Sequence, residues 1–205
     1  LDQLTELSVA LGSSPDIGPL LDRILRVAKH MTDADGGTLY RPSADRSSLE
    51  FCISLNDTLG LYQGGISGKP IELAGVPLLD DEGMPNHASV AAWAANSGQP
   101  VNIEDVYQAA DFNFSGMRSF DIAFGYRTQS ILTVPMLDHE GELVGVLQLI
   151  NAKDPDTGDI RPFSGTDQRF IEALAAQAAV ALTNGQLIVQ LGELLEGLVN
   201  LINIG

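Results

Sequence analysis

The chain has 205 residues, 44% of them hydrophobic and 19% charged, which is enough apolar content to bury one substantial core. Eleven Lys and Arg residues against 27 Asp and Glu residues give a net charge of −16, which disfavours nucleic acid and anionic lipid as partners. The single cysteine, Cys52, excludes an internal disulfide and a thiolate-rich metal site and is typical of a reducing compartment. We therefore expect a cytoplasmic domain that contacts neither nucleic acid nor membrane.

The two ends of the sequence indicate a piece of a longer polypeptide. The chain starts at Leu1 rather than Met, and it stops within an apolar helical pattern. We expect an output domain elsewhere in the same chain. The predicted organisation is an N-terminal linker and dimerisation helix over 1–13, a sensory domain over 14–184, and a C-terminal signalling helix over 185–205.

Two helices are predicted at the N-terminus. The first has leucines at helical spacing and ends at Gly12. The second is predicted to begin at the cap residue Ser14, with Pro15 and Asp16 in its first turn. Its expected buried stripe consists of Ile17, Leu20, Leu21, Ile24, Leu25, Ala28 and Met31.

From Gly36 the apolar pattern changes to the alternation of strands. Residues 38–40 and 49–55 predict two adjacent antiparallel strands joined by a turn over 42–46. In the second strand, the expected apolar face is Leu49, Phe51, Ile53 and Leu55. The segment 56–85 is rich in Gly, Pro and Asp, so we expect a long loop with at most short strands.

A third helix is predicted from the cap residue Asn86 to a stop at Ser97 and Gly98, followed by a short strand over 100–103. The next segment, 105–126, holds six of the 11 Phe and Tyr residues. Because a core would spread such residues out, we interpret this segment as an irregular lid. Residues 130–137 and 143–150 then predict a central hairpin, and Ser164 with Asp167 predicts the capping box of a long final helix.

The sequence lacks the common catalytic motifs. The histidines His30, His87 and His139 lack the spacing of a zinc site, and no phosphate loop or nucleophile elbow is present. The acidic run 80–82 is better explained as solvated surface, and Cys52 as a small packed residue than as a nucleophile. We therefore expect a segment that is not an enzyme.

Several motifs together resemble the GAF domain of cyclic-nucleotide phosphodiesterases, cyclases and bacterial signalling proteins. They are the run 97–107, Phe120 with Asp121, the run 125–132, and the run 145–151 followed by Phe163 and Asp167. The resemblance implies an α+β fold: about six antiparallel strands, helices behind the sheet, and a ligand pocket in front roofed by the segment before the hairpin. Of the Asn-Lys, Phe and Asp-Glu signature of nucleotide-binding members, Asn151, Phe163 and Asp167 match. Lys153 lies one position late and Gln168 replaces the Glu.

The resemblance also implies a ligand site, for which cAMP and cGMP are the leading candidates. Asp121 matches an aspartate beside the nucleotide, Thr128 a hydroxyl donor, and Val90 with Ala91 the start of a helix that lines the base. Phe124 stands where nucleotide-binding members have a threonine, which removes a donor and adds bulk. The expected site is completed by Phe120 and Cys52.

Two functions remain open: a sensor that relays ligand binding through its terminal helices, and a ligand-free dimerisation scaffold whose pocket is filled by its own side chains. In both, a wide apolar stripe on the last helix predicts a homodimer in which the terminal helices form a bundle. The stem is expected to be soft, with a break at Asn184 and Gly185. The dimerisation residues are predicted to be Leu187, Leu191, Leu195, Leu198 and Ile202.

Overall fold

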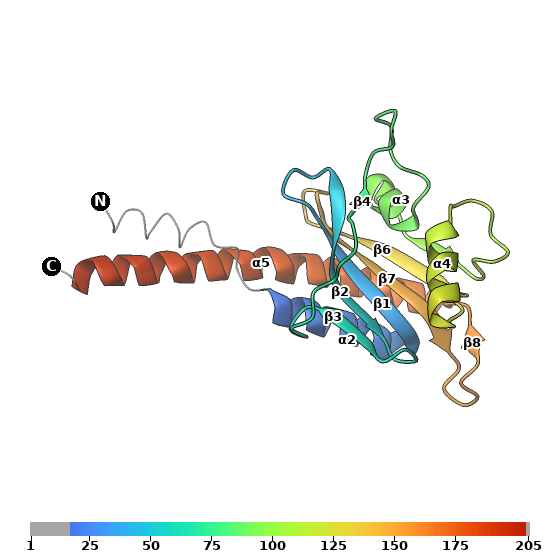
Figure 1. Cartoon of the computed structure of the whole chain (residues 1–205). Coiled ribbons are helices and arrows are strands. Elements are labelled where there is room, and N and C mark those ends of the chain that lie inside the picture. The colour runs from blue at the N-terminus through green and yellow to red at the C-terminus, as the bar shows by residue number, and fades with distance from the viewer. Residues whose placement is uncertain (1–16, 204–205) are drawn as a thin grey trace.

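The computed structural model describes the backbone of residues 17–203 and the side chains of residues 17–185. A mixed set of helices surrounds one antiparallel sheet, with α2 and α5 on one face and α3 and α4 on the other (Figure 1). The elements are α2 (Gly18–Thr32), β1 (Ala34–Pro42), β2 (Ser48–Asn56), β3 (Leu61–Gly64), β4 (Val76–Pro77), α3 (Val90–Ser97), β5 (Val101–Ile103), α4 (Ser115–Phe124), β6 (Ile131–Leu137), β7 (Leu143–Lys153), β8 (Ile160–Arg161) and α5 (Gly165–Asn203).

The sheet has the strand order β3-β2-β1-β7-β6-β5, and every pair in it is antiparallel. The two-residue strands β4 and β8 pair with β2 and β7. This confirms the predicted α+β fold and both hairpins. The long loop between β2 and α3 contains only β3 and β4, as the sequence predicts.

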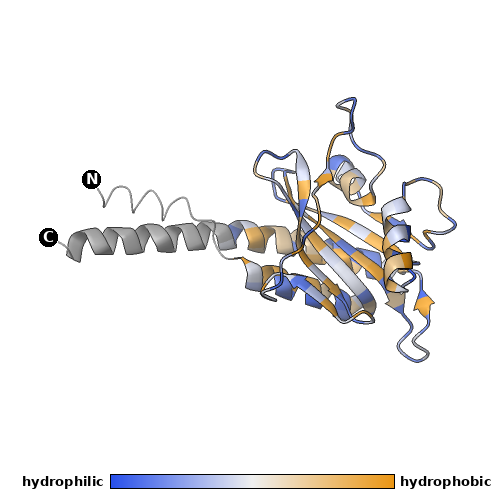
Figure 2. Cartoon of the chain, in the orientation of Figure 1, coloured by the Kyte–Doolittle hydropathy of each residue, from blue (hydrophilic) through white to orange (hydrophobic). Residues whose placement is uncertain are grey.

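The main core lies between the sheet and the α2–α5 layer. From α2 it receives Leu21, Ile24, Leu25 and Ala28, and from α5 it receives small residues such as Ala175 and Ala179, which let that helix approach the sheet closely. Figure 2 shows apolar residues recurring along the central strands and polar residues concentrated in the loops. One predicted member of the α2 stripe is wrong: Met31 is exposed, and Thr32 is buried in the last turn, where its hydroxyl donates to the carbonyl oxygen of Ala28.

A bulge divides the apolar row of β2 between the two faces of the sheet. The register pairs Leu39 with Ile53 and Tyr40 with Phe51, so Cys52 is left between the two pairs. As a result, Ile53 packs in the main core, whereas Phe51 contacts a second cluster on the other face. The prediction of a single apolar face for this strand was therefore wrong.

Two predicted helix caps differ from the structure. α2 begins after Ile17, so Ser14 is not its cap. α3 is capped by Ser89, whose hydroxyl accepts from the amide of Ala92, while Asn86 donates its side-chain amide to the carbonyl oxygen of Pro77. Asn86 therefore anchors the preceding loop instead of starting the helix.

The segment expected to be an irregular lid contains the ten-residue helix α4. Asp121 is the one residue of this helix that is buried. The helix lacks a continuous buried apolar stripe, which is the signal that sequence periodicity detects. The prediction of irregular structure was therefore wrong for residues 115–124.

The last helix begins with the predicted capping box. The amide of Ser164 donates to Asp167 Oδ2 at 2.8 Å, and the amide of Asp167 donates to Ser164 Oγ at 3.0 Å. α5 continues without a break through Gly185 to Asn203 and extends past the sheet in Figure 1, so the expected break at Asn184 and Gly185 is wrong. The predicted dimerisation side chains and the predicted helix 1–13 lie outside the described residues. Among the described helices, none is long and apolar enough to span a bilayer.

Candidate functional site

A cavity of about 470 Å³ lies between the sheet and α4. Its floor comes from β1, β2 and β7, and one wall comes from α4. A third side is formed by the segment between β3 and β4. The lining residues are Gly37, Thr38, Tyr40, Phe51, Ser54, Leu55, Asn56, Leu61, Gln63, Ile71, Glu72, Leu73, Met117, Phe120, Phe124, Thr128, Gln148 and Ile150.

Two aromatic pairs face this cavity. From the sheet, the rings of Tyr40 and Phe51 lie 4.7 Å apart and are tilted by 50°. From α4, the rings of Phe120 and Phe124 stack at 4.5 Å. Phe124 is 54% exposed, so it borders the cavity from its rim and does not fill it.

The polar groups of the floor are mostly bonded to one another. Tyr40 donates its hydroxyl to Gln148 Oε1 at 3.3 Å, and Gln148 Nε2 donates to Thr133 Oγ1 at 3.0 Å. The hydroxyls of Thr38 and Ser54 form a further bond at 3.3 Å. Burial of the Tyr40 hydroxyl raises its pKa far above the ordinary range, so this group is a neutral donor.

Asn56 differs from these floor residues. The side chain is 4% exposed, and its oxygen accepts from the amide of Leu59 at 2.9 Å. Its amide nitrogen makes no hydrogen bond among the described residues. The side chain faces the Tyr126 hydroxyl closely enough to lower the pKa of that group, against the larger effect of burial, which raises it. Because this nitrogen is itself buried, its N–H donor is not exposed to the cavity.

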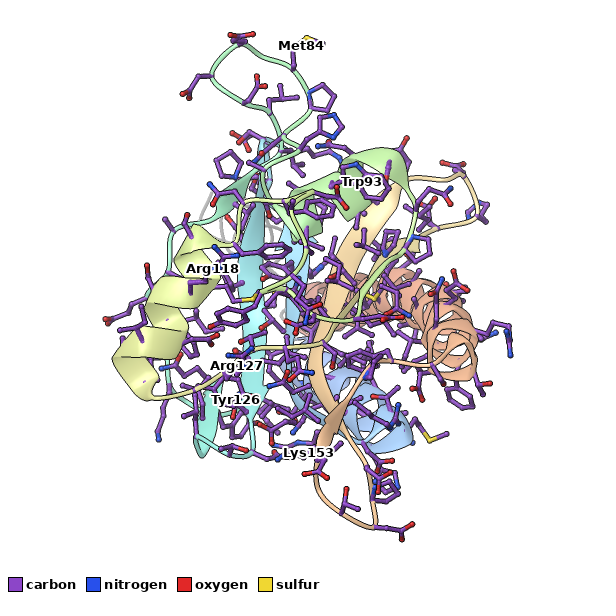
Figure 3. The ribbon with its side chains drawn as sticks, turned by 90° about the vertical axis from the view of Figure 1, so that its right-hand side faces the viewer. Met84, Trp93, Arg118, Tyr126, Arg127 and Lys153 are labelled. Carbon is purple, nitrogen blue, oxygen red and sulfur yellow. The ribbon has the colours of Figure 1, made fainter. Side chains whose placement is uncertain are left out.

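Asp121 attaches α4 to the rest of the domain. It is 3% exposed, and its carboxylate accepts from the Thr128 amide at 2.8 Å, the Thr128 hydroxyl at 2.9 Å and the Tyr107 hydroxyl at 2.7 Å. The guanidinium groups of Arg127 and Arg118 lie over the ring of Tyr107, at 4.3 Å and 5.6 Å from its centroid. Figure 3 shows Arg118 on α4 and Arg127 on the segment that follows it. The carboxylate thus bonds to the backbone and hydroxyls rather than to either arginine.

A second buried network holds the base of the segment that follows α4. The Tyr126 hydroxyl donates to Asp35 Oδ2 at 2.7 Å and accepts from Asn151 Nδ2 at 2.9 Å. Asp35 Oδ1 accepts from Lys153 at 2.6 Å and Thr58 at 2.8 Å. Burial of Asp35 favours a raised pKa, but hydrogen bonds from Lys153, Tyr126 and Thr58 outweigh it and lower the pKa.

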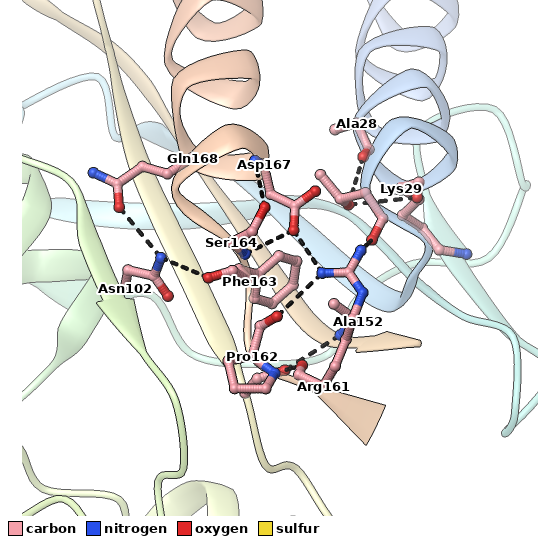
Figure 4. A network of polar contacts seen from close by, with 12 residues as sticks. Ala28, Lys29, Asn102, Ala152, Arg161, Pro162, Phe163, Ser164, Asp167 and Gln168 are labelled. Atoms are coloured by element: carbon pink, nitrogen blue, oxygen red, sulfur yellow. Dashed lines mark hydrogen bonds and ion pairs between the residues drawn. The ribbon is translucent and has the colours of Figure 1, made fainter. Parts of the chain in front are cut away.

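A path of hydrogen bonds and short chain segments connects the cavity with the start of α5. Thr128, which lines the cavity, is followed by Ser130, whose amide donates to Asn151 Oδ1 at 3.2 Å. The Ser130 hydroxyl donates to the carbonyl oxygen of Arg161 at 2.8 Å. The guanidinium of Arg161 pairs with Asp167 Oδ2 at 2.6 Å and donates to the last turn of α2 (Figure 4).

The structure separates the predicted ligand residues into two groups. Thr128, Phe120 and Phe124 line the cavity. Asp121 lies behind the wall and is bonded to Thr128, and the remaining three are packed in the interior. Val90 belongs to the cluster around Val106, Ala91 to the cluster around Tyr40, and Cys52 packs against the main core.

Several residues that line the cavity were not predicted from the sequence. Asn56 and Gln148 were not singled out, because a lone amide in a strand carries no spacing signal. Leu73 and Ile71 sit in a segment without periodicity. Two residues compared above with the nucleotide-binding signature, Lys153 and Asp167, do not pair with each other. Lys153 forms an ion pair with Asp35, and Asp167 forms one with Arg161.

A second, more polar hollow lies beside α2 and the β7–β8 turn, with Lys29, Lys153 and four aspartates around it. Its two lysines are already paired, Lys29 with Asp57 and Lys153 with Asp35. Within the described residues, no group of three His, Cys, Asp or Glu side chains is placed to hold a metal ion.

This chain matches only a small part of each of the much longer phosphodiesterases to which it is similar. The dual 3',5'-cyclic-AMP and -GMP phosphodiesterase 11 of Drosophila melanogaster is 35% identical over 98 residues, 48% of this chain and 6% of that protein. The cGMP-specific 3',5'-cyclic phosphodiesterase of Drosophila mojavensis is 25% identical over 185 residues, 89% of this chain and 15% of that protein. The chain therefore spans less than a sixth of either relative.

Solved structures show the same fold at low sequence identity. The GAF domain/HD domain protein of Geobacter sulfurreducens has a TM-score of 0.59 at 17% identity, covering 86% of this chain and 98% of that one. The GAF domain of an Acinetobacter phosphoenolpyruvate-protein phosphotransferase has a TM-score of 0.57 at 16% identity, covering 91% and 94%. The family model of the GAF domain matches residues 16–182, so the chain belongs to the GAF domain family.

Proposed function

We propose that this GAF domain is a regulatory sensor that binds a small molecule between its sheet and α4 and relays occupancy to α5. The observation that carries the proposal is the cavity itself, which is about 470 Å³ in volume and lined mainly by apolar side chains. This size and lining are typical of small-molecule sites. The segment acts by binding and not by catalysis.

The attachment of α4 supports a ligand-dependent wall. Three residues of this helix face the cavity, Met117, Phe120 and Phe124, while Asp121 is the residue of the helix that is buried. A ligand in the cavity would give the three apolar side chains a packing surface that the empty site lacks. It would therefore favour the position of α4 in which they are covered.

A route for relay is supported by the hydrogen bonds that lie along the path from Thr128 to Asp167. They join the segment that follows α4 to β7, to β8 and to the first turn of α5. A chain of contacts is a candidate path, and coupling has to be measured. We propose that α5 delivers the signal to an output domain in the same polypeptide, with Leu187, Leu191, Leu195, Leu198 and Ile202 pairing two chains.

For the ligand, cAMP and cGMP are the first compounds to test, because the relatives are cyclic-nucleotide phosphodiesterases. The alternative function is a scaffold without ligand. It predicts a site closed by its own side chains, and the exposed ring of Phe124 beside an open cavity favours the sensor.

The test compares the wild-type chain with Ser54→Phe, which places a ring in the cavity, and with Ser47→Phe, which places the same ring on an exposed turn. Each protein is purified, extracted and analysed by mass spectrometry, and is then melted with and without cAMP and cGMP. We expect a small molecule to accompany or stabilise the wild type and Ser47→Phe but not Ser54→Phe.

Relay is measured in the same samples by amide hydrogen exchange. With a ligand bound, exchange should slow in α4 and also at the β8–α5 junction. A wild-type chain that retains no small molecule and is stabilised by neither nucleotide would favour the scaffold function. If ligand slowed amide exchange in α4 alone, the result would support ligand binding and contradict the proposed relay to α5.

A further inference from the structure

The charge of the cavity lining restricts the ligand. Among the described lining residues there is no lysine, arginine or histidine, and the one charged side chain is the carboxylate of Glu72. The nearest arginines of the α4 region, Arg118 and Arg127, lie over the ring of Tyr107 and do not line the cavity. The chain as a whole has a net charge of −16. An anion entering this cavity would lose hydration without meeting a cation.

The N-terminus of α4 does not supply the missing positive charge. Helix N-termini bind anions through free amides, but the amide of Ser115 already donates to Asn113 Oδ1 at 3.0 Å. Ser115 and Gly116 are outside the lining, and Met117 is the first residue of the helix that reaches it. The electrostatics of the site therefore favour an uncharged ligand.

The aromatic pairs indicate the shape of that ligand. Tyr40 with Phe51 on the sheet side and Phe120 with Phe124 on the α4 side offer ring surfaces to one cavity. A flat ring system can stack on such surfaces, and this contact adds to the gain from the apolar area buried.

We propose that the site takes an uncharged, planar aromatic molecule in preference to an anion such as a cyclic nucleotide. This inference rests on the proposed function, because it assumes that the cavity binds a small molecule. It goes further by naming the chemical class of that molecule.

The charge preference is tested with two fluorescent probes that share one ring system. N-phenyl-1-naphthylamine is uncharged, and 1-anilinonaphthalene-8-sulfonate is the same framework with one sulfonate. We expect the wild-type chain to bind the uncharged probe at least about tenfold more tightly, and Ser54→Phe to abolish that binding. Equal or tighter binding of the sulfonate, competed by the same variant, would overturn the ligand class while leaving the sensor function intact.

Two matched charge variants test whether the preference for the uncharged probe arises in the cavity or from exposed apolar surface elsewhere. Leu73 lines the cavity and is 64% exposed, whereas Leu79 is 51% exposed and does not line it. Leu73→Arg should reduce the preference for the uncharged probe by about threefold or more, and Leu79→Arg should leave it unchanged. Equal effects of both variants would show that the preference does not arise in the cavity.

Displacement of N-phenyl-1-naphthylamine by micromolar cAMP or cGMP would reject the inference and support a nucleotide sensor. Absence of all probe and nucleotide binding would reject both this inference and the sensor function.

Discussion

Removal of the Asp121 carboxylate is the most direct perturbation of the α4 wall. In Asp121→Ala, the amide and hydroxyl of Thr128 lose their acceptors, and Thr128 is itself buried. An unsatisfied buried donor costs about 1–3 kcal/mol. Tyr107 is partly exposed, so its hydroxyl can turn to water. The two Thr128 donors therefore predict a loss of about 2–4 kcal/mol, once partial relaxation is allowed for.

The assay is urea unfolding followed by the fluorescence of Trp93, the single tryptophan, together with hydrogen exchange of α4. Asp121→Ala should lower the free energy of unfolding and speed exchange across residues 115–124. Asp121→Asn keeps one acceptor oxygen and should lose roughly half as much.

The control is Ile122→Ala on the same helix. Ile122 is 85% exposed, so its truncation should change stability by less than about 0.5 kcal/mol. If Asp121→Ala stayed within that range and α4 exchanged as in the wild type, the carboxylate would not be what holds this helix, and the reasoning would be refuted.

Four further predictions follow from other parts of the chain. The lowered pKa of Asp35 stabilises the fold above its unfolded value of about 3.9, and this contribution is lost as the pH falls through the lower folded pKa, so Asp35→Asn should flatten the stability profile below about pH 4. An unchanged acid slope would contradict this. Burial raises the pKa of the Cys52 thiol to about 11, so at pH 8 a disulfide reagent should label the folded chain roughly 200-fold more slowly than the urea-unfolded chain, and equal rates would be inconsistent with that environment. Asn151 has a φ of 54°, so Asn151→Ala should be less stable than Asn151→Gly by about 1 kcal/mol in urea unfolding, and the reverse order would show that backbone strain is not decisive. Leu191→Glu with Leu198→Glu should give monomers by light scattering, whereas persistent dimers would place the partner surface elsewhere.

Local patterns account for the parts of the fold that sequence reasoning predicted well. The first hairpin is encoded by alternation and a polar turn, and the second by two apolar runs on either side of a polar turn. The capping box of α5 needs only Ser164 and Asp167, three residues apart. The choice of Ser89 over Asn86 as the α3 cap is different. Both residues can cap a helix, and the outcome depends on the contact of Asn86 with Pro77 in the neighbouring loop.

The candidate site was harder to predict from the sequence because its key contacts join distant parts of the chain. Tyr126 reaches Asp35 across 91 positions, and Lys153 reaches Asp35 across 118. No spacing rule relates such residues. The bulge at Cys52 also moves Phe51 to the cavity side, a change that strict alternation cannot anticipate.

The weak attachment of α4 has a thermodynamic consequence for the proposed sensor function. A helix without a buried apolar stripe is positioned by few interactions, here mainly those of Asp121. A ligand that buries about 100 Å² of the apolar wall would contribute about 2.5 kcal/mol. That is comparable with the stabilisation expected from Asp121 and corresponds to a population shift of about 70-fold. Because the two terms are of similar size, ligand occupancy can decide the position of α4, whereas a helix with a full buried stripe would stay in place with or without ligand.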